Sequence, residues 1–314
     1  MTVGTGAVYD RGYRPYEGPR GGRSAARSAL LRASVRRALG LRRSWRQKVA
    51  PFVLLGIAVI PAIVNVGASF LTRDTAASGF EFITYRDYVG VSNSLLVFVA
   101  LTAPDLLCPD RRQRVLPLYF ARPLKGIDYV AAKVGAMAGI LFAFGFLPQV
   151  VLFVGQMLVS EDGSLSYAGD NLDVLWKVPV SVALFSVFFS VVGLALASLT
   201  SRRITAGAII VGLFLVTSIT SAVLVGDEGT GTTTIETSNG TTTFVEHAPG
   251  STAALIDVWT LPLHLRDVVF LGEVDPAGPL NGVAGGGILA AVVYAIVLAI
   301  AAGTLFVRYY EVES

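Results

Sequence analysis

Six long apolar runs alternate with polar segments along the chain. The runs span residues 49–72, 88–104, 134–160, 178–201, 204–226 and 276–307. A helix as long as the first run rises about 36 Å, which is enough to cross the roughly 30 Å hydrocarbon layer of a bilayer with some tilt. The pattern predicts an all-α integral membrane protein, with a six-span membrane domain over residues 49–308.

The second run, residues 88–104, is the shortest of the six. We therefore expect Asp87 and Asp105 to lie at its two membrane interfaces. No run carries an ionisable side chain near its centre, whereas transporters driven by protons or ions normally need such groups inside the membrane. If the protein moves a substrate, the energy must come from elsewhere.

Basic residues predict how the runs are oriented. Segments 1–48, 105–133, 202–203 and the C-terminal segment hold 12, 6, 2 and 1 of the 25 lysines and arginines, and the intervening segments hold the other four. Cytoplasmic segments of membrane proteins attract positive charge. Both termini, including the tail at residues 309–314, and the segment 105–133 are therefore expected in the cytoplasm.

The segment before the first run divides into two parts. Within residues 23–48, Leu31 and Val35 recur at helical spacing while Arg32 and Arg36 recur on another face. This predicts a basic amphipathic helix in the headgroup layer, attracted by anionic membrane lipids. Residues 1–22 contain prolines and tyrosines, and form either an extended docking arm or a disordered tail in the cytoplasm.

The expected external segment, residues 226–275, is too long for a simple connector. Two threonine-rich stretches surround Asn239-Gly240, which is a strong signal for a β-hairpin. The following stretch is apolar but is interrupted by Pro262 and Arg266, among other polar residues. It favours short re-entrant helices over a seventh span.

Composition and motifs exclude several function classes. The chain is 53% hydrophobic and 15% charged, against about 25% charged in soluble proteins. Its basic residues are sorted between segments, as topology requires, which argues against a nucleic-acid partner. The sequence contains no G-x-x-x-x-G-K-[ST], H-E-x-x-H or G-x-S-x-G motif. We expect no catalytic residue, metal site or cofactor in this chain.

The segment "PDRRQRVLPLYFARPLKGIDYVAAK", residues 109–133, has an unusual composition for a loop between two spans. Pro109, Pro117 and Pro123 rule out one continuous helix but leave room for a short one. On such a helix Leu116, Tyr119 and Phe120 share one side, after several arginines. Exposed aromatics flanked by arginine favour a protein partner, although they could also lie flat on lipid headgroups.

This loop resembles the coupling-helix loop of type-2 ABC transporter permeases. The resemblance rests on Asp110-Arg111-Arg112, on the run from Leu116 through Tyr119 and Pro123 to Leu124, and on Asp128-Tyr129-Val130 with Lys133. The order of an amphipathic helix, six spans and a long external segment before the last span is also similar. The arm "YDRGYRPYEGPR" is similar to that of bacterial, especially actinobacterial, members.

The resemblance implies a permease in the bacterial inner membrane, paired with a second permease copy or paralogue and with separate ATP-binding subunits that hold ATP and magnesium. It implies coupling or ATPase-docking roles for Asp110, Arg111, Arg112, Arg114, Leu116, Tyr119, Phe120, Arg122, Pro123 and Lys133. It also places Asn93, Thr217 and Thr220 beside a possible substrate path. The spans offer hydroxyls and apolar surface, so we expect export of an amphipathic or lipid-like substrate. The alternative is a non-transporting scaffold or sensor that recruits a cytoplasmic partner.

Overall fold

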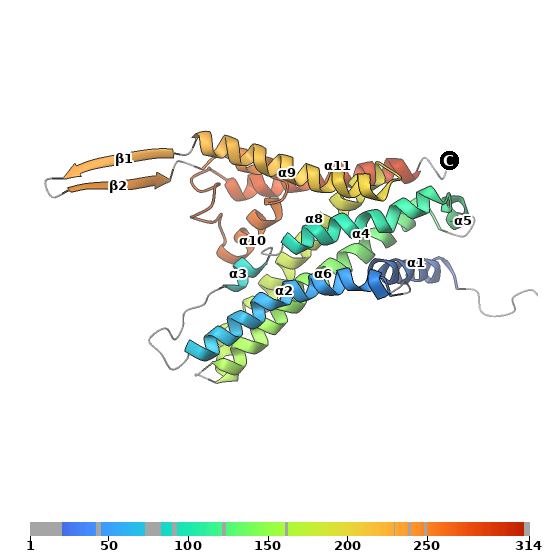
Figure 1. Ribbon diagram of the computed structural model, residues 1–314, viewed down its shortest axis with the longest axis horizontal. Helices are drawn as coiled ribbons and strands as arrows, with labels where there is room; N and C mark the ends of the chain where they lie inside the picture. The colour runs from blue at the N-terminus through green and yellow to red at the C-terminus, as the bar shows by residue number, and fades with distance from the viewer. Residues whose placement is uncertain are drawn as a thin grey trace, which may run out of the picture.

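A computed structural model describes residues 21–41, 45–72, 83–89, 93–120, 124–160, 163–228, 230–237, 240–247 and 250–310 (Figure 1). Its elements are α1 (Arg23–Ala38), α2 (Trp45–Thr72), α3 (Tyr85–Tyr88), α4 (Asn93–Arg112), α5 (Leu116–Phe120), α6 (Gly126–Val159), α7 (Ser164–Asp170), α8 (Val174–Ser198), α9 (Arg203–Glu228), β1 (Thr230–Thr237), β2 (Gly240–His247), η1 (Thr252–Ile256), α10 (Leu261–Leu271) and α11 (Gly286–Tyr310).

Five helices among the described residues are long and apolar enough to cross a membrane: α2, α6, α8, α9 and α11. They coincide with five of the six predicted runs, and the protein is consistent with a multi-pass membrane protein. Two of them differ from the runs by eight residues or more at their start. α6 begins at Gly126 instead of residue 134, and α11 begins at Gly286 instead of residue 276.

The second predicted span differs most from the prediction. The helix there, α4, is shifted along the sequence to Asn93–Arg112 and is not one of the five apolar helices. It continues through Pro104 and Pro109. Neighbouring helices can satisfy the backbone groups that a proline leaves free, so proline is tolerated in such a helix. Asp105 therefore lies within α4, where it pairs with Arg203 at 2.8 Å, and Asp87 lies in the separate α3.

α8 is the centre of the bundle. It packs against α4, α6, α9, α10 and α11, and two thirds of its most apolar stretch is buried inside the molecule. The corresponding share for α2 and α9 is 17%. In a helical membrane protein, surface that is not covered by protein faces lipid or a partner chain, and α2, α9 and α11, of which 22% is buried, provide much of that surface.

Two amides inside the apolar helices hold the segment that precedes α4. Asn65 of α2 donates through Nδ2 to the carbonyl of Ile83 at 2.9 Å, and Gln149 of α6 donates through Nε2 to the carbonyl of Tyr85 at 3.1 Å. Both side chains are buried. These amides attach α3 to the ends of two spans, which is the packing role that polar residues often have within membranes.

The segment after α9 contains the only strands in the described part of the chain. β1 and β2 pair antiparallel, and Thr237 pairs with Gly240, so Gly240 begins the second strand instead of lying in the turn. The hairpin projects away from the helices, at the left of Figure 1. After it, η1 packs on α9, while α10 packs on α8 and α11.

Candidate functional site

The residues of the predicted coupling loop lie at one end of the bundle. α1, α5 and the last turn of α11 lie at that end, on the right of Figure 1, and we call it the α5 end. α1 packs against both α6 and α4. Its Leu30, Ser34 and Ala38 are buried against them, so this helix turns part of its apolar face toward protein. It ends at Ala38, well before residue 48.

The Asp110 cluster joins three helices at the α5 end. We use this name for Asp110 of α4, Arg37 of α1, and Tyr129 and Lys133 of α6. Lys133 Nζ lies 2.9 Å from Asp110 Oδ2, and Arg37 Nη1 lies 2.5 Å from Oδ1. The Tyr129 hydroxyl donates to Oδ2 at 2.8 Å. One carboxylate therefore ties α1, α4 and α6 together.

Burial distinguishes this cluster from an exposed docking surface. Asp110 is fully buried and Lys133 is 2% exposed. Lys133 also donates to the carbonyl of Leu106 at 2.9 Å. Lys133 lies about two turns inside α6, not at its start. A partner protein cannot contact either side chain in this conformation, so any role of theirs in coupling acts through the helices that they join.

A second carboxylate fastens α1 further along α6. Asp128 is 2% exposed and accepts from Nε of Arg23 at 2.6 Å and from Nε of Arg27 at 2.7 Å. The backbone N–H of Lys125 also donates to it, at 3.1 Å. α1 is thus held at both of its ends, to Asp128 of α6 near its start and to Asp110 of α4 through Arg37 near its last turn.

Side chains of α4 and α11 hold the end of α8. Arg111 donates to the carbonyl of Ser198, and Arg308 donates through Nη2 to the carbonyl of Leu199 at 3.3 Å. The last carbonyls of a helix lack partners within the helix and carry partial negative charge. Both arginines donate hydrogen bonds to these carbonyls and place positive charge beside them. Arg111 therefore contacts α8 within the chain and is only partly exposed.

α5 packs inward, contrary to the expected exposure of its apolar side. Leu116 is buried, and the Tyr119 ring lies 5.8 Å from the Tyr129 ring, which in turn lies 5.2 Å from that of Tyr309. Burial raises the pKa of the Tyr119 phenol, and the charge of Asp110 adds to the effect. The interior of the same chain thus covers Leu116 and part of Tyr119, two of the side chains for which an external partner was predicted.

The exposed part of the loop is the turn between α4 and α5. Arg112, Gln113 and Arg114 are exposed, and Arg114 has a φ of 51°, in the left-handed region, where the chain reverses. Predicted docking residues Arg122 and Pro123 lie outside the described residues, as does the Phe120 side chain. Of the predicted set, Arg112 and Arg114 are the two whose described side chains a partner could reach freely.

The residues predicted to lie beside a substrate path belong to α4 and α9. α4 packs against α9, so the two helices that carry them are neighbours. The Thr217 hydroxyl donates to the carbonyl of Leu213 at 3.0 Å, and that of Thr220 donates to Val216 at 2.7 Å. Both hydroxyls are therefore satisfied within α9. Thr220 is exposed, and the side chain of Asn93 is outside the described residues.

Sequence patterns did not reveal a second polar cluster, at the opposite end. Arg266 of α10 donates to Asp267 at 2.6 Å and to the carbonyl of Val89 at 3.0 Å, and Arg86 of α3 lies 3.5 Å from Asp275. His264 is 8% exposed and its Nε2 has no hydrogen-bond partner among the described residues. Burial lowers the pKa of His264. This cluster anchors α10 to α3.

No protein-family model matches the chain, and no curated protein matches it.

Proposed function

We propose that this chain is the transmembrane permease subunit of an ATP-binding cassette transporter. In this proposal a separate subunit binds ATP and magnesium and hydrolyses the nucleotide. Two permease chains, identical or paralogous, form the path. The sequence pattern of the loop at residues 109–133 is the origin of the proposal, and the structure of the α5 end supports it.

The observation that carries the proposal is the connection between the exposed turn and the buried Asp110 cluster. Arg112 and Arg114 face outward directly after Asp110, whose carboxylate is fixed to α1 and α6. Below the turn, Leu116 and Tyr119 pack into the core. A force on the turn therefore acts at once on α4 and α6, because close-packed interiors transmit displacement. A motor subunit needs such a contact.

The proposed topology counts α4 as a sixth span. Its 20 residues rise about 30 Å, and its charged side chains lie toward the α5 end or pair with other helices. The α5 end then faces the cytoplasm, in agreement with the distribution of lysine and arginine. The hairpin and α10 lie outside the cell.

The proposed substrate is amphipathic or lipid-like and is exported. α9 supports this by presenting an exposed apolar face that includes Thr220, with Ile219 and Val223 on either side. This face suits either a second permease chain or an apolar ligand, since neither requires a fixed charge.

The test is ATP hydrolysis by the protein isolated from its native membranes. We expect the tagged chain, purified in mild detergent, to carry magnesium-dependent ATPase activity that the chain alone cannot provide. The Arg112→Glu/Arg114→Glu variant should lose at least about tenfold of that activity, because charge reversal across an interface costs several kcal/mol. Arg112→Lys/Arg114→Lys should retain it.

Arg202→Glu is the matched control, since Arg202 is an exposed arginine in the turn between α8 and α9 at the same end. It should not change the activity. A wild-type preparation with no ATPase activity would favour the scaffold or sensor alternative. Equal activity in the double reversal and the control would show that the turn is not the docking surface.

A further inference from the structure

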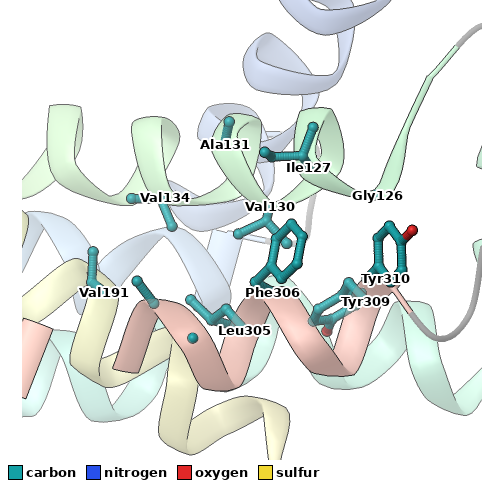
Figure 2. A pocket seen from close by; sticks show the side chains of 12 residues that line it. Gly126, Ile127, Val130, Ala131, Val134, Val191, Leu305, Phe306, Tyr309 and Tyr310 are labelled. Carbon is teal, nitrogen blue, oxygen red and sulfur yellow. The ribbon is translucent and has the colours of Figure 1, made fainter. Parts of the chain in front are cut away.

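An apolar groove runs between α6 and α11 at the α5 end (Figure 2). It has a volume of about 480 Å³, within the range of small-molecule sites. Ile127, Val130 and Val134 form one wall, and Leu305, Phe306 and Tyr310 form the other. Its surface is almost entirely apolar. Ile127 is 55% exposed and Phe306 is 47% exposed, so the groove is open at the side of the bundle.

The groove has the length of one bilayer leaflet. On α6 it extends from Gly126 to Val134, and on α11 from Ala302 to Tyr310, which is about 12 Å along each helix. The hydrocarbon core of a bilayer is roughly 30 Å thick, so the groove ends before the midplane. A transmembrane helix of another chain would need a groove across the full thickness. A lipid acyl chain occupies one leaflet only.

Basic side chains lie near the end of the groove at Gly126. Lys125, which is exposed, directly precedes Gly126 at the start of the groove. The side chains of Arg23 and Arg27 are 41% and 50% exposed, and both contact Asp128, one residue after Ile127. Two cationic side chains thus pair with a single, buried carboxylate, and Lys125 contacts the same carboxylate only through its backbone N–H. Tyr310, 59% exposed, lies at the same level, where tyrosine is typical of a membrane interface.

We infer that this groove binds one acyl chain of an anionic phospholipid, with the phosphate at Lys125, Arg23 and Arg27. The apolar groove matches the acyl chain of such a lipid, and the basic side chains near the end of the groove match its phosphate. The lipid would fill the space between α6 and α11 and reach α1 through its headgroup. This inference depends on membrane insertion and not on an ATPase partner.

Lipid retention in native mass spectrometry tests the inference. The wild-type chain, loaded in detergent with phosphatidylglycerol or with phosphatidylcholine of the same acyl chains, should retain phosphatidylglycerol in preference. Gly303→Leu should abolish retention, because Gly303 lines the groove and a β-carbon there meets nothing within 4 Å. Gly212→Leu on α9, where the space is equally open, should retain the lipid as the wild type does.

Two further variants separate the tail from the headgroup and guard against misfolding. Ala131→Leu fills the groove from the exposed side of α6, and should also lose the lipid. Lys125→Gln should reduce the preference for phosphatidylglycerol about fivefold. One basic side chain near an anionic membrane surface contributes about 1 kcal/mol of binding free energy, which corresponds to that factor. Circular dichroism and gel filtration verify that each variant is folded.

Three results would overturn the inference. Unchanged lipid retention in folded Gly303→Leu and Ala131→Leu would show that the groove is not the site. Equal retention of the two lipids by the wild type would remove the role of the basic residues. Loss of a dimer instead of a lipid in Gly303→Leu would assign the groove to a second copy of the chain.

Discussion

Asp110 is a buried charge with three partners from two other helices. Within an apolar environment such a charge is costly unless its partners are in place. Arg37, Tyr129 and Lys133 satisfy both carboxylate oxygens. Removal of the Asp110 carboxylate would leave the buried charge of Lys133 with only the carbonyl of Leu106 among these contacts. The cluster is therefore sensitive to substitution in a way that its exposed neighbours are not.

We predict that Asp110→Asn destabilises the folded protein by about 3–5 kcal/mol, because the charge of buried Lys133 loses its carboxylate. The double variant Asp110→Asn/Lys133→Met should recover part of the loss. Thermal unfolding in detergent, followed by circular dichroism, measures both effects. As a control, Asp173→Asn breaks an exposed pair with Lys177 and should cost less than about 1 kcal/mol. Equal losses in both single variants would refute the role of burial.

At the scale of the helices, the structure differs from the sequence prediction where the bounds of a helix depend on contacts with residues far away in the sequence. The apolar runs predicted α2, α8 and α9 closely, because hydrophobic length alone determines a span. α4 could not be placed in this way, since Pro104 and Asp105 resemble a helix end locally. Pro104 and Asp105 are tolerated within α4 because the fold brings Arg203 and the neighbouring helices close to them.

In the predicted docking loop too, features set by the local sequence could be predicted, and features set by distant contacts could not. Arg112 and Arg114 could be recognised as exposed from the local pattern, because arginines beside a turn seldom lie inside. The partial burial of Tyr119 could not be predicted, since it depends on the ring of Tyr129, which in turn packs on the last turn of α11. Asp110 and Lys133 were both identified as residues of the loop motif, but the contact between them depends on the register of α4 against α6.

α10 is predicted to loosen in acid because of His264. Burial lowers the pKa of this side chain, so the folded protein keeps it neutral at pH values where an unfolded chain binds a proton. Its contribution to stability is full above the ordinary pKa of about 6.5 and falls as the pH decreases below that value. Asp257, Arg266 and Asp275 are the charged groups near it.

Limited proteolysis between pH 7.5 and pH 5.5 measures this effect at the segment that includes α10. Cleavage should increase in acid for the wild type and should depend less on pH for His264→Phe, which keeps an aromatic ring but has no proton to gain. If the wild type and the variant show the same pH dependence, the titration of His264 does not control α10.

Across the whole molecule, the charged clusters lie at the two ends and apolar surface lies between them. We predict that, in intact cells on a Cys108→Ser background, Leu165→Cys reacts with a membrane-impermeant thiol reagent and Gln113→Cys does not. Leu165 of α7 is 91% exposed, and Gln113 is exposed in the turn between α4 and α5. Both should react after the cells are opened. Labelling of Gln113→Cys from outside would invert the proposed topology and remove the docking surface from the cytoplasm.

All three partners of Asp110 lie between Arg37 and Lys133, in the first half of the 314-residue chain. The ribosome has therefore delivered every member of the cluster before it begins α8. The bundle can neutralise its buried carboxylate early in synthesis, while the remaining spans have yet to emerge. Lys133 then enters the bilayer with its counter-ion already present. The nascent protein therefore has no unpaired Lys133 charge in the membrane during synthesis of its C-terminal half.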